Sequence, residues 1–149
     1  MMLSKNFSLE ELTRSDIAAR KGLNNVPNEA EIANLKRLAA FLEEVRATLI
    51  TPILVNSGYR SKAVNDAVGS HDGSQHRLGC AADIRVTNRT PEGLMLAIYE
   101  SKLQYDQLLL EFADGKGGGW VHISIPNVAG GKPRRQALKI GRGGTFVYP

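Results

Sequence analysis

The chain has 149 residues, 42% of them hydrophobic, and a formal net charge of +4 from 19 basic and 15 acidic side chains. This length fits one domain, residues 1–149, that can bury an ordinary hydrophobic core. Its one cysteine, Cys80, excludes an intramolecular disulfide framework, and no window reaches the roughly 18 apolar residues of a membrane span. The first residues lack the apolar run of a secretory signal, so we expect a product made in the cytoplasm that does not insert into membranes.

The N-terminal half predicts helices around one strand. Residues 8–11 have the Ser-x-x-Glu pattern of a capping box, which starts a short helix. Residues 28–49 carry apolar side chains at steps of three and four, the spacing of one buried helical face. Residues 52–56 form a short apolar run typical of a buried strand, and residues 60–68 indicate a short helix or a turn.

The C-terminal half predicts more strands around one further helix. Residues 81–86 form a strand, and a threonine cap followed by proline starts a helix that we expect over 90–103. Residues 107–112 and 119–125 are strand-like runs joined by the glycine-rich loop 113–118, which favours a hairpin. Together these elements predict an α+β fold, with helices packed on a small antiparallel sheet.

The C-terminal tail, residues 127–149, is glycine-rich and contains five basic and no acidic side chains. We expect it to wrap the surface, with residues 145–148 adding an edge strand. Such charge can attract an acidic polymer, either nucleic acid or an anionic cell envelope. We favour a solvated basic terminus instead, because such charge patterns are weak indicators of binding. Few aromatic residues interleave with the basic ones, so no stacking platform for single-stranded nucleic acid is evident.

The stretch from Ser74 to Asp83 is the most informative in the chain. His76 and Asp83 are seven residues apart, a spacing that does not place them on one helical face, so a turn at Gly79 must bring them together. His122, on a predicted strand, offers a third ligand. Two imidazoles and one carboxylate would leave a fourth position open for water, as catalytic zinc requires. We therefore predict that His76, Asp83 and His122 bind Zn²⁺.

Several motifs of this chain recur together in one group of enzymes. The pattern S-x-H-x-x-G-x-A-x-D is filled by Ser74, His76, Gly79, Ala81 and Asp83, with Trp120-Val121-His122 and Asn56-Ser57-Gly58-Tyr59-Arg60-Ser61 as further matching segments. With them the chain resembles the zinc D-Ala-D-Ala carboxypeptidases and murein endopeptidases, which share the hedgehog-type fold. The likeness is greatest to the compact, phage-associated and endolysin-like branch. It covers about residues 5–126, which would form the core of the domain.

The resemblance implies a role for each matching site residue. His76, Asp83 and His122 would be the zinc ligands. Arg60 would face the carboxylate of the substrate or the oxyanion that forms during attack, and a guanidinium suits either because it stays charged and donates paired hydrogen bonds. Ser74 would bind substrate or hold the loop that carries His76.

The chain departs from the pattern of its relatives at the general base. Many relatives carry an acid three residues before the final histidine, and that position is Gly119 here. Glu111 is our candidate, because an even six-residue hairpin loop would place it opposite Trp120 and on the sheet face of His122. Asp114, in the loop, is the second candidate. Cys80 has no evident base nearby and is interpreted as a packed residue, and His71 as a loop residue.

The predicted function is that of a zinc metallopeptidase that hydrolyses peptidoglycan stem peptides, either as a D,D-carboxypeptidase or as a murein endopeptidase. We expect a monomer that acts on the bacterial cell wall, in the periplasm or after phage-assisted release. The alternative is a catalytically weak, zinc-containing structural or wall-binding module of a phage particle, which Gly119 would explain. Which stem-peptide bond is cut stays open.

Overall fold

The protein is built around a six-stranded sheet. Its computed structural model describes all residues, 1–149. The strands are β1 (Leu54–Ser57), β2 (Ala81–Arg85), β3 (Gln107–Glu111), β4 (Trp120–Ser124), β5 (Gln136–Gly141) and β6 (Gly144–Val147). Their order in the sheet is β1-β2-β4-β3-β5-β6. The first four pair antiparallel as predicted, whereas β5 pairs parallel with β3, so the sheet is mixed. The α+β class is confirmed.

Five helices surround this sheet, and their ends follow local capping signals. They are α1 (Leu9–Thr13), α2 (Asp16–Lys21), α3 (Glu29–Leu49), α4 (Lys62–Ala67) and α5 (Pro91–Tyr99), and a 3₁₀ helix, η1 (Gln75–Leu78), follows α4. Ser8 and Asn28 each form a complete capping box, which confirms the starts predicted for α1 and α3. None of the helices combines the length and apolarity of a membrane span.

The last predicted helix is shorter than expected. We predicted it to extend to residue 103, but α5 ends at Tyr99. The Ser101 hydroxyl donates to the carbonyl oxygen of Ile98 and accepts the N–H of Leu103, so these groups bond locally instead of continuing the helix. The α2 and η1 helices were not predicted, because each is too short to show a helical period in the sequence.

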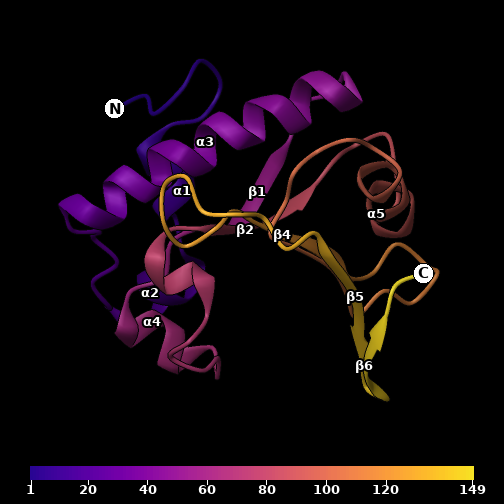
Figure 1. Ribbon diagram of the computed structural model, residues 1–149. Helices are drawn as coiled ribbons and strands as arrows, with labels where there is room; N and C mark the ends of the chain where they lie inside the picture. The colour runs from indigo at the N-terminus through magenta and orange to yellow at the C-terminus, as the bar shows by residue number, and fades with distance from the viewer.

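One face of the sheet carries the hydrophobic core. The helices α3 and α5 pack against this face (Figure 1). Their buried side chains meet those of alternate strand residues, among them Ala82, Ile84, Leu108, Leu110, Val121 and Ile123. Because successive strand side chains point to opposite faces, the residues between them lie on the other face. Asp83, Glu111 and His122 therefore share the face that the core helices leave free.

The C-terminal residues continue the sheet, and part of our prediction for them is wrong. The expected edge strand is present as β6, but the segment before it forms β5 instead of only wrapping the surface. Two of its cations serve the fold: Arg134 binds Asp106, and Arg135 lies 4.9 Å from the ring centroid of Tyr105. Fewer charges are therefore free for an acidic polymer than the sequence suggested.

A buried polar network ties this segment to the turn that carries His76. The Asp106 carboxylate is almost fully buried and accepts from the Arg134 side chain at 2.8 and 3.1 Å and from its backbone N–H at 3.0 Å. The Gln75 side-chain amide donates to Asp106 at 3.1 Å and to the Asn127 side chain at 2.8 Å. Gln75 directly precedes His76, so the C-terminal segment braces the site turn.

We expect Asp106→Asn to destabilise the protein by about 2 kcal/mol at neutral pH, since charged hydrogen bonds to Arg134 are lost. Those bonds lower the pKa of Asp106 below its ordinary value. The stabilisation is therefore complete above the unfolded-state pKa of about 3.9 and is lost as the pH falls through the lower folded-state pKa.

Urea unfolding of both proteins at pH 7 and at progressively lower pH measures this difference, which should shrink in acid. Lys62→Met is the matched control, because it breaks exposed pairs with Asp66 and Asp72 that solvent screens, and it should change stability much less than Asp106→Asn does. A difference between wild type and Asp106→Asn that does not change with pH would contradict the assignment.

Candidate metal centre

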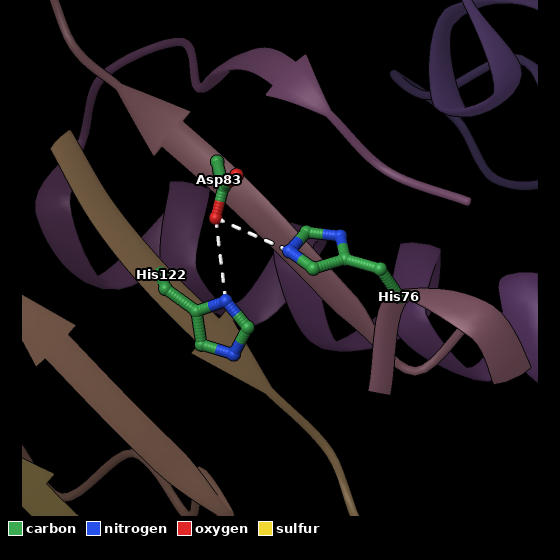
Figure 2. Close-up of side chains that lie close together, drawn as sticks. All are labelled: His76, Asp83 and His122. Atoms are coloured by element: carbon green, nitrogen blue, oxygen red, sulfur yellow. Dashed lines mark hydrogen bonds and ion pairs between the residues drawn. The ribbon is translucent and has the colours of Figure 1, made fainter. Parts of the chain in front are cut away.

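The structure brings the three predicted ligands together on the free face of the sheet. One ligand-capable atom from each of His76, Asp83 and His122 lies within 4.8 Å of the others, and all three residues are buried. Asp83 on β2 pairs directly with His122 on β4, while His76 comes from η1. Figure 2 shows the Asp83 carboxylate facing both imidazole rings.

The turn that carries His76 is fixed by its neighbours. The Ser74 hydroxyl caps η1 and accepts the backbone N–H of His76 at 3.3 Å, which is one of the two roles predicted for Ser74. Gly79 ends η1 with a φ of +78°, and a Cβ there would lie 2.9 Å from the carbonyl oxygen of Glu31 in α3. Only glycine allows this close approach of the turn to the helix.

Hydrogen bonding orients the His76 ring. Its Nδ1 lies 2.7 Å from the carbonyl oxygen of Gly58. A carbonyl can only accept, so Nδ1 carries a proton and the other ring nitrogen, Nε2, faces Asp83 Oδ1, 3.3 Å away. His122 Nδ1 lies 3.2 Å from the same oxygen. Nitrogen and oxygen atoms that lie this close together need a proton or a metal cation between them. A hydrogen bond from Nδ1 to a backbone carbonyl is a usual support of a metal-binding histidine.

Two of the three separations in this cluster are typical of zinc ligands. Ligands at 2.0–2.2 Å from a tetrahedral zinc lie about 3.3–3.6 Å apart, close to the distances of 3.3 and 3.2 Å from Asp83 Oδ1 to the imidazole nitrogens. Two imidazoles and one carboxylate also suit zinc chemically and leave one position open. The residues present therefore fit Zn²⁺.

The charge on Asp83 is maintained despite its burial. Burial by itself raises the pKa of this carboxyl, but the adjacent imidazoles of His76 and His122 hold its pKa well below the usual range. Its second oxygen, Oδ2, lies 3.4 Å from Arg60 Nη2. Asp83 is thus an ionised group that is ready to bind a cation.

Arg60 lies beside the ligands and is largely committed to protein contacts. Its side chain is 14% exposed. Besides Asp83, its donors reach the Ser57 hydroxyl at 3.3 Å and the Asn65 side-chain oxygen at 3.4 Å, and its backbone N–H donates to the carbonyl of His76 at 3.0 Å. These contacts position Asp83 and join β1 to the site turn.

A comparison with known protein families agrees with this geometry. The sequence model of the Peptidase M15 family matches residues 5–124. The chain belongs to the peptidase M15 family. Peptidases of this family depend on zinc, in keeping with the His-Asp-His cluster. No curated protein matches the chain. The resemblance inferred from the motifs is confirmed at the level of the family, and the phage-associated branch stays a prediction.

Glu111 of this M15 peptidase lies where strand pairing predicted. Glu111 on β3 pairs with Trp120 on β4, which confirms the predicted register and places it diagonally from His122, at a Cβ separation of about 7 Å for such pairs. The Trp120 indole N–H donates to Glu111 Oε2 at 2.7 Å. Burial raises the pKa of the Glu111 carboxyl. Asp114, in contrast, accepts the N–H groups of Lys116 and Gly118 and serves the loop.

The backbone of this M15 peptidase explains why position 119 has no acid. Gly119 has a φ of +88°, and a Cβ there would lie 2.6 Å from both the carbonyl oxygen of Glu111 and the backbone nitrogen of Ala113. A side chain at 119 would overlap with fixed backbone atoms. The hairpin therefore has no room for the acid that the resemblance led us to expect at this position.

Sequence reasoning missed part of the surroundings of the metal centre. An open depression beside Asp83 is also lined by Asn56, Arg85 and Trp120. Arg85 follows Asp83 by two residues in the same strand, so the period-two alternation of side chains was a signal that could have found it. Asn56 offered no such signal, because a bulge shifts the pairing of β1 with β2.

We predict that the purified protein binds about one zinc ion per chain and that His76→Ala or His122→Ala abolishes this binding. Zinc at 100 times its dissociation constant should stabilise the wild type by about 2.7 kcal/mol and leave these variants unchanged. Elemental analysis and unfolding with and without chelator measure both effects. His71→Ala is the control, because His71 lies in an exposed loop where its Nδ1 accepts from Gly73. Metal-free wild type that zinc does not stabilise would overturn the site.

We also predict that Gly119→Ala destabilises the protein by at least about 2 kcal/mol more than Gly117→Ala, because of steric overlap at 119. Both glycines have positive φ, but a Cβ at Gly117 would have no atom within 4 Å. The pair thus separates overlap from backbone strain, which the two variants share. Equal losses in denaturant unfolding would show that the hairpin can accommodate a side chain at 119.

Proposed function

We propose that the protein is a zinc peptidase that hydrolyses peptidoglycan stem peptides at a bond next to a D-amino acid. The observation that carries this proposal is the buried His76-Asp83-His122 cluster on the free face of the sheet, in a chain of the M15 family. Both a D,D-carboxypeptidase and a murein endopeptidase of the endolysin-like type are consistent with it. We further propose that the protein acts as a monomer on the bacterial cell wall.

Zinc, when bound, supplies a Lewis acid that activates water and polarises a carbonyl group. Glu111 is the general base: it takes a proton from the attacking water and returns it to the leaving amine. Its burial favours this role, because burial raises the pKa of the carboxyl toward neutral pH, where a general base is most effective. Trp120 holds one carboxylate oxygen of Glu111 at 2.7 Å, which leaves the other free for the proton.

The cations of the site stabilise negative charge. Arg60 neutralises the outer oxygen of Asp83 and places positive charge beside the position where the scissile carbonyl would bind. Charge that develops on this carbonyl during attack is stabilised by a cation fixed in a poorly solvated site. Ser74 contributes through the turn, because its hydroxyl fixes the backbone of His76.

We expect Glu111→Gln to lower kcat by about 10²- to 10⁴-fold while zinc content stays at the wild-type level, since the variant removes proton transfer but no ligand. Digestion of purified murein, read by the masses of the released peptides, measures activity and identifies the bond that is cut. Asp114→Asn is the matched control, because Asp114 binds loop backbone and should leave kcat within about threefold of wild type.

The outcome of this digest separates the proposal from its alternative. Peptide release that persists in Glu111→Gln would exclude Glu111 as the base but keep the peptidase. Zinc-loaded wild type that releases no peptide would favour the wall-binding or structural module of a phage particle.

A further inference from the structure

Arg85 presents a cation beside the metal ligands on the face where substrate would bind. It follows Asp83 by two residues in β2, so both side chains emerge on the same face, with Cα atoms about 6.7 Å apart. Arg85 and Asp83 line one open depression together with Asn56 and Trp120. An extended peptide advances about 3.3–3.6 Å per residue, so Arg85 lies within about two substrate residues of the metal centre.

The Arg85 side chain is held in place, yet most of its donors are free. Its Nη2 donates to the carbonyl oxygens of Gly119 at 2.7 Å and of Gly117 at 3.3 Å. These bonds fix the guanidinium against the loop between β3 and β4. The other three N–H groups, on Nε and Nη1, have no partner in the protein. A preorganised guanidinium with free donors binds carboxylates well, because little side-chain entropy remains to be lost.

The other arginine of the site is less suited to bind an anion from the substrate. Arg60 is mostly buried, its charge is paired with Asp83, and its side chain also donates to Ser57 and Asn65. Arg85 forms no ion pair and is exposed. The geometry therefore divides two roles that the sequence assigned to Arg60 alone, with Arg60 acting at the reacting carbonyl and Arg85 at a substrate carboxylate.

We propose that Arg85 is a specificity-determining residue that binds a substrate carboxylate within about two residues of the scissile amide. The inference rests on the proposed function and names the group that the site recognises. Stem peptides offer this chemistry from two sources, the C-terminal carboxylate and the free α-carboxylate of γ-linked D-glutamate. Both present the same planar anion, and amidation removes the charge of either one.

Four synthetic stem pentapeptides test the proposal with zinc-loaded enzyme: both carboxylates free, the C-terminus amidated, D-glutamate replaced by D-isoglutamine, and both groups amidated. For wild type, amidation of the recognised carboxylate should lower kcat/KM by about 10- to 100-fold. Arg85→Gln should lower kcat/KM on the free peptide by a similar factor. Amidation of the same carboxylate should then lower kcat/KM of this variant almost no further. Arg85→Lys should retain part of the preference for the free carboxylate.

A control variant and the pattern across the four peptides exclude indirect effects. Lys116→Gln removes a nearby exposed cation of the same loop and should keep the full preference. Since Arg85 also holds the loop, a purely structural loss would reduce kcat/KM of Arg85→Gln equally on all four peptides, and that result would overturn the proposal. Equal kcat/KM of wild type on all four peptides would overturn it too.

A binding measurement separates this inference from the proposed function. Calorimetry with the zinc-loaded variants Glu111→Gln and Glu111→Gln/Arg85→Gln reports peptide affinity without cleavage. If wild type cleaves none of the peptides but Arg85-dependent binding of the free carboxylate persists, the peptidase assignment fails and the carboxylate site stands. If peptides are cleaved but amidation changes neither affinity nor kcat/KM, the proposed carboxylate site is wrong and the peptidase assignment is retained.

Discussion

The pairing of Asp83 with His122 across β2 and β4 is the contact on which the site depends. In a sheet, a shift of one residue turns every side chain to the opposite face. Here the register is set by the apolar residues that flank the ligands, Ala82 and Ile84 on β2 and their partners on β4, which are buried under α3 and α5. Hydrophobic packing on one face thus holds the ligands on the other.

The position of the proposed base follows from the shape of the β3–β4 hairpin. The left-handed backbone at Gly119 brings the chain against the carbonyl of Glu111, which leaves no room for a side chain at position 119. The same turn pairs Glu111 with Trp120, so a carboxylate is supplied from the end of β3 instead. Arg85 donates to the carbonyl of Gly119, and the hairpin thereby links the proposed base to the arginine proposed to bind a substrate carboxylate.

The C-terminal segment lies beyond the family match, which ends at residue 124, yet it supports the site from two sides. Strand β5 pairs along β3, and Ile140 accepts the N–H of Phe112 at 2.8 Å, next to Glu111. Arg134 donates to the Asp106 carboxylate, which also accepts from Gln75 in the turn of His76. The segment behaves as a brace for the two elements that carry a ligand and the proposed base.

The sequence alone determined the features that depend on neighbours along the chain. Capping boxes start α1 and α3, apolar periodicity defines the buried face of α3, and an even hairpin loop gave the pairing of Glu111 with Trp120. The ligand motif and the Trp-Val-His segment also identified the three residues that the fold brings together. Tertiary structure decided the parallel pairing of β5, the commitment of Arg60 to Asp83 and the free donors of Arg85. These depend on contacts between segments far apart in the sequence, and such contacts leave no periodic pattern along the chain to be read.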